Sequence, residues 1–343
     1  MTTHDSPNPG HILQLGLGFW ASKVLLSAVE LDLFTKLAEA PRTCAEVESA
    51  LGLHARSSRD FLDALVALGL LAREGDGDAA RYGNTRDTGM FLNSRGPAYV
   101  GGMLKFANVR LWAAWANLTD SLRTGLPQNA GRETGLSFYD EVYPNPEKLA
   151  GFMRAMAGIS AGPCMALAEK FDFGPYQTLT DAGGATGLLS ICVARRHPHV
   201  RATTFDLPPV APIARETIAQ AGLAERVSVA SGDFFVDPLP KADVVVMGQV
   251  LHNWDLAEKK RLVRAAYEAL PKGGAFIAIE SIIDDARKEN AFGLLMSLNM
   301  LVETTAGFDY TGADFARWCR EAGFSKIEVL PLGGPTSAAV AIK

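Results

Sequence analysis

The chain has 343 residues, of which 48% are hydrophobic and 21% are charged. This length predicts two domains, and the composition predicts a soluble globular protein. The net charge of −5 gives no electrostatic reason to expect a nucleic-acid or acidic-membrane partner. The four cysteines lack metal-binding or disulfide-type spacing, so we expect free thiols in a cytoplasmic protein without a metal site.

The N-terminal segment lacks the basic region and cleavage site of a secretory signal. An apolar stretch follows at residues 12–33, but Lys23, Glu30 and Asp32 interrupt it. A membrane span needs about 20 almost uninterrupted apolar residues. The stretch therefore predicts a helix that belongs to a core or to an interface between subunits.

The region up to about residue 88 predicts two helices followed by a hairpin. Thr43 and Glu46 have the spacing of a capping box for a helix over residues 43–51, and a second helix is predicted over 57–68. The segment "GLLAREGDGDAARYGNT" predicts two short strands joined by a Gly/Asp turn. This order is typical of a winged helix, but the acidic wing disfavours DNA binding. We expect residues 1–100 to form a dimerisation domain instead.

The second predicted domain, residues 101–343, begins with a helical lead-in over residues 101–176. Within it, the long irregular segment "GLPQNAGRETGLSFYDEVYPNPE" predicts a loop at the lip of an acceptor site. From residue 177 onward, apolar strands alternate with helices, which predicts an α/β fold with a doubly wound, mostly parallel, Rossmann-like sheet.

The strands of this sheet are predicted over residues 178–182, 202–205, 227–230, 244–247 and 275–279, with helices over 188–196, 212–221 and 256–270. A helix over 312–322 and strands over 326–330 and 338–342 complete the domain. The last two strands are joined by a short turn-rich segment, which predicts that the final strand is antiparallel.

Polar residues follow three of these strands at the edge where doubly wound sheets bind ligands. Asp181 lies in the first strand, before the glycine turn "DAGGATG", which does not match the dinucleotide fingerprint G-x-G-x-x-G. Asp206 ends the second strand, where a carboxylate can accept both hydroxyls of a ribose. Asp233 and Phe234 follow the third strand and suit the amine and the ring of adenine. Together these residues predict a nucleoside site that needs no phosphate.

With "FDLP", "GDFF", "LHNWD", "PKGG" and "IES", the glycine turn resembles class I S-adenosylmethionine-dependent methyltransferases, and more narrowly the caffeic-acid and acetylserotonin O-methyltransferase group. The resemblance covers nearly the whole chain. It implies S-adenosyl-L-methionine as cofactor, a small-molecule acceptor from secondary metabolism, and a homodimer built through an N-terminal winged-helix domain. The cofactor contacts expected on this basis are Asp181, Gly183, Gly184, Asp206, Leu207, Gly232, Asp233, Phe234 and Gln249.

The same resemblance implies that His252 is the general base and that Glu280 and Asp309 assist it. Histidine suits this role because it titrates near neutral pH, and a carboxylate on the imidazole fixes its tautomer. The chain departs from the family pattern at three positions: Ala185 replaces a glycine, Asn253 replaces the Asp after the histidine, and Asp309 replaces Glu. The last two changes concern the strength of the base and leave the cofactor site unaffected.

The side chains expected to contact the acceptor are Met153, Met156, Met296, Asn299 and Met300. Methionine adapts to irregular apolar ligands, so these residues do not identify the acceptor. We expect methyl transfer to a hydroxyl group. Two alternatives stay open at this point: S-methylation of a small thioether or thiol acid, and a winged-helix regulator that senses S-adenosylmethionine without turnover. A base with two supporting acids argues against the regulator, because a sensor needs no base.

Overall fold

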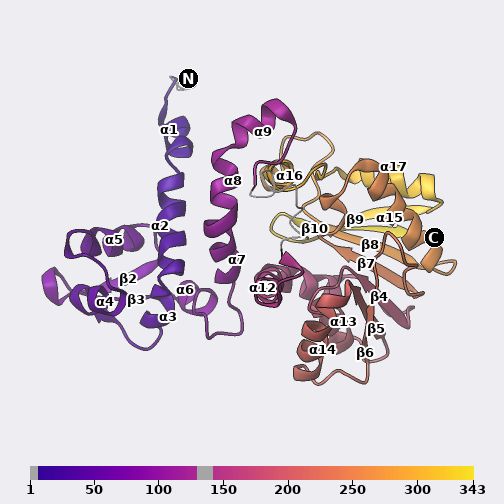
Figure 1. Ribbon diagram of the computed structural model, residues 1–343, viewed down its shortest axis with the longest axis horizontal. Helices are drawn as coiled ribbons and strands as arrows, with labels where there is room; N and C mark the ends of the chain where they lie inside the picture. The colour runs from indigo at the N-terminus through magenta and orange to yellow at the C-terminus, as the bar shows by residue number, and fades with distance from the viewer. Residues whose placement is uncertain (1–6, 130–141) are drawn as a thin grey trace, which may run out of the picture. The chain divides into compact units, whose positions relative to one another are not determined.

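The computed structural model describes residues 7–129 and 142–343. The chain divides into two compact units, Met1–Leu111 and Trp112–Lys343. Figure 1 labels their helices and strands along the chain. The first unit extends beyond residue 100, where the sequence analysis placed the domain boundary, because Leu104 of the following helix packs against the N-terminal core.

The N-terminal unit is mostly helical and contains one small sheet. The two predicted helices and the hairpin are present, and the side-chain and backbone bonds of the capping box at Thr43 and Glu46 are both made. The strands form a three-stranded antiparallel sheet in the order β1-β3-β2. The elements are α1 (Gly10–Gly16), α2 (Phe19–Glu30), α3 (Leu33–Leu37), β1 (Arg42–Thr43), α4 (Cys44–Leu51), α5 (Ala55–Ala67), β2 (Leu71–Glu74), η1 (Gly77–Ala79), β3 (Arg81–Asn84), α6 (Arg86–Phe91), α7 (Gly101–Phe106) and η2 (Ala107–Leu111).

The predicted apolar helix at residues 12–33 is divided into α1, α2 and the start of α3. The C-terminal part of α2 enters the core through Ala28 and Val29, whereas apolar side chains at its start and in α1 are exposed. Among them, Ile12, Leu15 and Trp20 are 72%, 75% and 60% exposed. By length and composition alone, Gly10–Glu30 is apolar enough to cross a membrane. The stretch also carries Lys23 and Glu30, and both are bonded to the side chain of Asn108.

The second unit contains a seven-stranded sheet in the order β6-β5-β4-β7-β8-β10-β9. The first five strands in this order run parallel, and β10 is antiparallel to both of its neighbours, which confirms the predicted fold class and the predicted last strand. The strands are β4 (Thr178–Ala182), β5 (Arg201–Asp206), β6 (Val227–Ser231), β7 (Val244–Gly248), β8 (Ala275–Glu280), β9 (Lys326–Gly333) and β10 (Thr336–Ile342).

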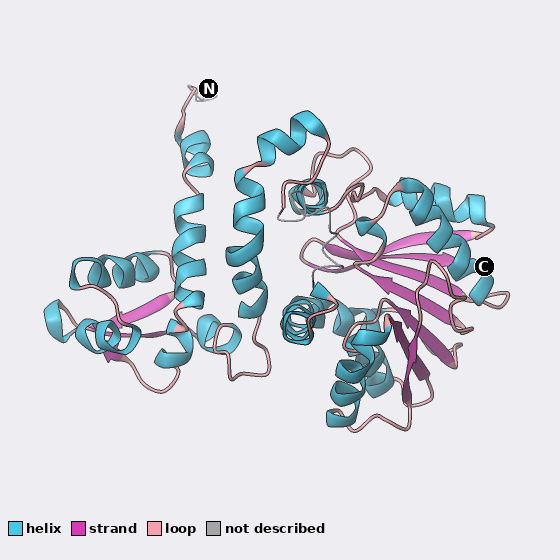
Figure 2. Cartoon of the chain, in the orientation of Figure 1, coloured by secondary structure: helices cyan, strands magenta, loops and turns pink. Residues whose placement is uncertain are grey.

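Helices cover both faces of this sheet (Figure 2). One hydrophobic core joins the sheet to α12, α13 and α14, and a second joins its other face to α15 and α17. The helical elements are α8 (Trp112–Ala116), α9 (Leu118–Thr124), α12 (Pro146–Lys170), α13 (Leu188–Arg196), η3 (Pro208–Val210), α14 (Ala211–Gln220), η4 (Leu251–Asn253), α15 (Leu256–Ala269), α16 (Ala291–Glu303) and α17 (Gly312–Ala322). Most of the predicted lip loop, residues 130–141, lies outside the described residues.

Candidate active site

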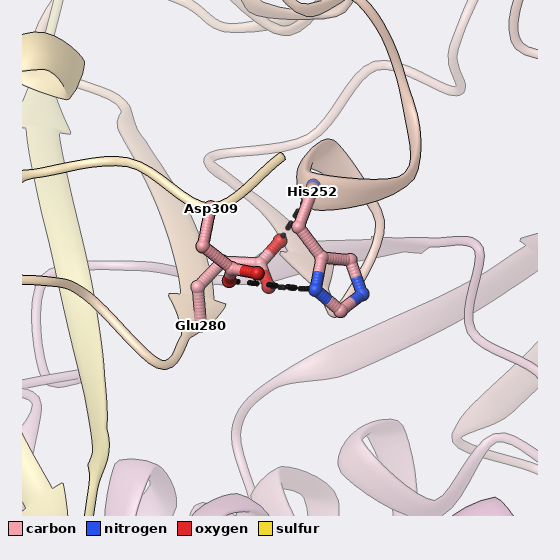
Figure 3. Close-up of side chains that lie close together, drawn as sticks. All are labelled: His252, Glu280 and Asp309. Atoms are coloured by element: carbon pink, nitrogen blue, oxygen red, sulfur yellow. Dashed lines mark hydrogen bonds and ion pairs between the residues drawn. The ribbon is translucent and has the colours of Figure 1, made fainter. Parts of the chain in front are cut away.

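The imidazole of His252 lies at the carboxyl edge of the parallel sheet, just beyond β7 (Figure 3). The five-residue apolar strand is fully buried apart from its last residue, which fixes where the chain leaves the sheet. The short η4 turn then places His252 beside the end of β8, where Glu280 is the last strand residue. The backbone N–H of His252 donates a long hydrogen bond of 3.4 Å to Glu280 Oε1.

Two carboxylates face the same nitrogen of His252. Nδ1 lies 3.6 Å from Glu280 Oε2 and 3.5 Å from Asp309 Oδ1, and all three side chains are buried. These contacts are longer than strong hydrogen bonds, yet no other polar group contacts Glu280 Oε2 or either Asp309 oxygen among the described residues. The arrangement favours a proton on Nδ1, which leaves Nε2 on the opposite side of the ring as the basic nitrogen.

The surroundings make His252 a stronger base than a free histidine. Burial would lower the pKa of its imidazole, but Glu280 and Asp309 outweigh that effect and raise the pKa to about 9. Burial also raises the pKa of the Glu280 carboxyl to about 7, despite the opposing attraction of His252. The His252 imidazole is therefore more basic, and more often protonated at neutral pH, than the ordinary histidine expected from the sequence.

Asn253, which departs from the family pattern, is directed at the backbone. Its side-chain nitrogen donates to the carbonyl oxygens of Gln249 and Val250 at 3.0 and 3.3 Å. Gln249 has a φ of 53°, a left-handed conformation that few residues other than glycine adopt. An aspartate could not donate these bonds, so the amide suits the turn that carries His252.

The glycine turn after β4 forms a tight cradle. Gly183 has a φ of 74°, and a Cβ atom there would lie 2.6 Å from Val250 Cγ2. A Cβ atom on Gly184 would lie 2.2 Å from Thr204 Oγ1. Neither position has room for a side chain, so both residues of this turn must be glycine. Ala185, which replaces the usual third glycine, also adopts a positive φ, of 49°.

Asp206 connects the three strand ends of this cradle. Its carboxylate accepts from the backbone N–H groups of Ala185 at 2.9 Å and of Leu207 at 2.7 Å, and its carbonyl oxygen accepts from Gly232 N. Burial raises the pKa of this carboxyl, and the two N–H donors oppose that effect. A carboxylate has about four acceptor sites, so two remain for the hydroxyls of a ribose.

Asp233 and Phe234 extend the cradle beyond β6. The Asp233 carboxylate accepts from Phe235 N at 2.8 Å, which fixes its orientation. The Phe234 ring lies 3.8 Å from the position that a Gly183 Cβ would take. The Phe234 ring therefore lies beside the glycine turn, and contact of Asp233 and Phe234 with the cofactor stays a prediction. The predicted contact Gln249 is at the same edge of the sheet, after β7.

Asp181 has a different position from the other predicted cofactor residues. Its side chain is buried beneath the turn and accepts from Ser190 Oγ at 3.2 Å. Burial raises its pKa to about 7. Its carboxyl carbon is 2.8 Å from a Cβ built on Gly184, so the side chain supports the cradle from below. A direct contact between Asp181 and the cofactor stays a prediction.

Three of the predicted acceptor residues lie on α16. Asn299 Oδ1 accepts from the indole nitrogen of Trp115 at 2.8 Å, which orients the amide, and Met296 and Met300 flank it on the helix. Ser297 on the same helix accepts from Asp309 N at 3.1 Å. Helix α16, which carries three of the expected acceptor contacts, is thus hydrogen-bonded directly to Asp309.

The other two predicted acceptor residues lie on α12. Met153 is 2% exposed and packs with Val142, Leu149 and Val210 in a small cluster that also contacts Ala185. Met156 lies one turn further along the helix and is partly exposed. Met153 therefore supports the cradle by packing, and contact of either methionine with the acceptor stays a prediction.

Two further residues interact with Asp309 or His252 and were not predicted from the sequence, Ser297 and Lys259. Ser297 offers no sequence signal, because its bond to Asp309 spans a loop. Lys259 does offer one. It lies on the buried face of α15 with Leu262, Val263 and Ala266, at the spacing of an apolar helical stripe. Lysine is rarely buried unless it has a partner, so a lysine in an apolar stripe indicates a buried polar or charged contact.

His252, Glu280 and Asp309 each offer a ligand atom, and these atoms lie within 4.8 Å of one another. That spacing fits a metal ion as well as a base with two acids. The hydroxyl chemistry expected from the sequence needs only the base, so the absence of a metal stays a prediction for this site.

The matches to known proteins agree with this geometry. A family model described as the O-methyltransferase domain matches residues 115–325, and another, described as the O-methyltransferase dimerisation domain, matches residues 13–94. The chain is 42% identical to the tetracenomycin polyketide synthesis 8-O-methyl transferase TcmO of Streptomyces glaucescens, over 100% of this chain and 99% of that protein. It is 39% identical to the N,N-dimethyltransferase OxyT of Streptomyces rimosus, over 80% and 79% of the two chains.

A solved structure extends the agreement to the whole fold. Human N-acetylserotonin methyltransferase in complex with S-adenosylmethionine superposes with a TM-score of 0.90 at 30% identity, covering 99% of each chain. These matches support neither of the two alternatives, the S-methyltransferase and the regulator that senses the cofactor without turnover.

Proposed function

Because the chain belongs to the O-methyltransferase family and is an S-adenosylmethionine-dependent enzyme of that family, we propose that it methylates a phenolic hydroxyl of an aromatic polyketide, with His252 as general base. The observation that carries this proposal is the single imidazole that faces two buried carboxylates at the carboxyl edge of the sheet. The acceptor class is supported by TcmO, named a tetracenomycin polyketide synthesis 8-O-methyl transferase, which matches the full length of the chain.

S-Adenosylmethionine, when bound, supplies an electrophilic methyl group on a sulfonium. The residues that would hold it are Asp206 for the ribose and Asp233 and Phe234 for the adenine, next to the glycine turn of Gly183 and Gly184. The donors and acceptors in the cradle fit a nucleoside, and the fixed orientation of both carboxylates reduces the entropy lost on binding.

His252 would take the proton of the acceptor hydroxyl at Nε2, while Nδ1 keeps its proton toward the acids. The resulting imidazolium is then stabilised by Glu280 and Asp309, which lie 3.6 and 3.5 Å from Nδ1. A phenol needs this step because the neutral hydroxyl is a poor nucleophile. A positioned base typically contributes 10²–10⁴-fold to the rate.

The deciding experiment measures turnover of a phenol panel by His252→Ala. We expect kcat to fall at least about a hundredfold while S-adenosylmethionine affinity changes little. Glu280→Gln should lower kcat less, because it weakens the support of the base and leaves the base in place. His199→Ala is the matched control, since His199 is bonded to Phe173 O near the opposite end of the strands. If His252→Ala keeps most of its kcat, the proposal is wrong.

The panel also includes aromatic amines, because one relative is named an N,N-dimethyltransferase. An amine with a free lone pair attacks without losing a proton first. Turnover of an amine that survives His252→Ala, together with inactivity toward phenols, would identify nitrogen as the acceptor atom.

We further infer that the protein is a cytoplasmic homodimer, held together by an N-terminal winged-helix domain. The match to a dimerisation domain over residues 13–94 supports this inference. So does the row of exposed apolar side chains on α1 and the start of α2, which a second copy would cover. The order of helices α4 and α5 followed by the β2–β3 hairpin supports the winged-helix assignment.

A further inference from the structure

Lys259 is a fully buried lysine close to the base. It lies on α15 and is 0% exposed, in line with the apolar residues Leu262, Val263 and Ala266. An ammonium group loses much hydration free energy on burial unless polar or charged partners replace the water. A buried Lys259 ammonium therefore needs polar or aromatic partners around it.

The Lys259 ammonium contacts two segments of the site at once. Nζ donates a hydrogen bond to the carbonyl oxygen of Trp254, two residues after His252. It also lies 3.5 Å from the centre of the Phe308 ring, directly before Asp309, in a cation–π contact. One side chain thus joins the segment that carries the base to the segment that carries one of its acids.

The charges of the site also favour a second cation. When Glu280 and Asp309 are both ionised, they carry two negative charges in a buried space, and a protonated His252 offsets only one of them. We infer that Lys259 is a positioning residue, whose ammonium holds the segments of His252 and Asp309 together and balances the second carboxylate. This inference rests on the proposed role of His252 as the base.

Three nearby charged groups act on the pKa of His252. Glu280 and Asp309 raise this pKa, and Lys259 lowers it. Lys259 itself is faced by those two acids and by Asp255 and Glu258 of its own helix start, while burial lowers its pKa to about 8. Removal of the ammonium should therefore make His252 harder to deprotonate.

The test compares Lys259→Met with the wild type. Methionine keeps most of the apolar volume and removes the charge. We expect the acid limb of the kcat/KM profile to move to higher pH, by roughly half a pH unit to one pH unit. This is the shift that removal of one nearby charge predicts at a moderate effective dielectric constant. Below the limb, kcat/KM should fall roughly three- to tenfold, which is this same shift expressed as a rate, with S-adenosylmethionine affinity within about twofold.

Lys260→Met is the matched control. Lys260 is the next residue on the same helix, but its side chain is 42% exposed and pairs with Glu321 at 2.7 Å. Its substitution should leave the acid limb in place. A uniform fall in kcat/KM at every pH in Lys259→Met, without movement of the limb, would show that Lys259 only packs and would overturn the inference.

A second readout does not depend on turnover. Histidine NMR titration, assigned with His252→Asn, should give a higher pKa for the His252 imidazole in Lys259→Met than in the wild type. An unchanged value overturns the inference whether or not His252 proves to be the base. If Lys259→Met does not fold, Phe308→Leu serves instead, because it removes the aromatic ring that contacts the ammonium. The pKa of the His252 imidazole should then also rise. An unchanged pKa would again overturn the inference.

Discussion

The side-chain amide of Asn253 donates a hydrogen bond to the carbonyl oxygen of Gln249 at 3.0 Å, and Gln249 is held in a left-handed conformation. The bond closes the turn between the end of β7 and the helical turn that carries His252. Asn253, one of the three departures from the family pattern, therefore shapes the backbone turn that carries His252.

Asn253→Asp should destabilise the protein. A carboxylate cannot donate to the carbonyls of Gln249 and Val250, and the loss of such bonds costs about 1–3 kcal/mol when the partners stay buried. The check is chemical denaturation monitored together with thermal unfolding. Asn117→Asp is the control, because Asn117 donates to Ala113 O at 3.1 Å in an exposed position, where water can replace the bond. Equal losses in the two variants would contradict this account.

The pH dependence of activity should have an acid limb above neutral pH. Glu280 and Asp309 raise the pKa of His252 to about 9, against the effect of burial. Below that value the imidazole carries its second proton and cannot accept one from a hydroxyl, so kcat/KM should rise with pH between about 7 and 9. Initial rates at saturating cofactor, over buffers of constant ionic strength, would measure this. A flat profile across that range would exclude His252 as the group that titrates.

Asp206→Ala should weaken S-adenosylmethionine binding more than tenfold. The substitution removes a charged acceptor for the ribose, worth about 1.5–3 kcal/mol, and also releases the N–H of Ala185 in the glycine turn. Isothermal titration calorimetry measures the affinity directly. Asp172→Ala is a suitable comparison, since Asp172 accepts from Gly174 N at an exposed turn outside the cradle. Affinity equal to that of the wild type would place the ribose elsewhere.

Charge on the N-terminal apolar face should dissociate the proposed dimer. Ile12 and Trp20 are 72% and 60% exposed, and the double variant Ile12→Glu, Trp20→Glu would place two carboxylates in a face that a partner copy covers. Light scattering at micromolar concentration should give a dimer for the wild type and a monomer for the variant. Val236→Glu changes an 80% exposed apolar residue in the second unit and should stay dimeric. A monomeric wild type would refute the dimer.

The sheet of the second unit could be predicted well from the sequence because its strands are short apolar runs bounded by turns, and the periodicity of the helices between them is clear. The predicted helices at residues 188–196 and 312–322 coincide with α13 and α17. The pattern also placed Asp206 and Asp233 at strand ends, since strand order fixes which residues lie at one edge.

The arrangement of side chains could not be predicted in the same way. Asp309 reaches His252 through a loop that periodicity does not describe, and the contacts of Lys259 arise only because Phe308 and Trp254 meet around it in space. Nor does alternation of residue types reveal that Asp181 points beneath the turn and accepts a hydrogen bond from Ser190. Such contacts depend on tertiary packing, which is not local in the sequence.

The position of β10 between β8 and β9 has a consequence for synthesis on the ribosome. Strand β9 is bonded only to β10 in this sheet, so neither strand can join β8 until residues 336–342 have left the exit tunnel. Before that moment β8, which ends in Glu280, is an exposed edge whose six residues are all buried in the finished fold. A nascent chain that stalls before residue 336 would therefore present an apolar strand edge open to misassociation, and chaperone binding during translation should be concentrated in that interval.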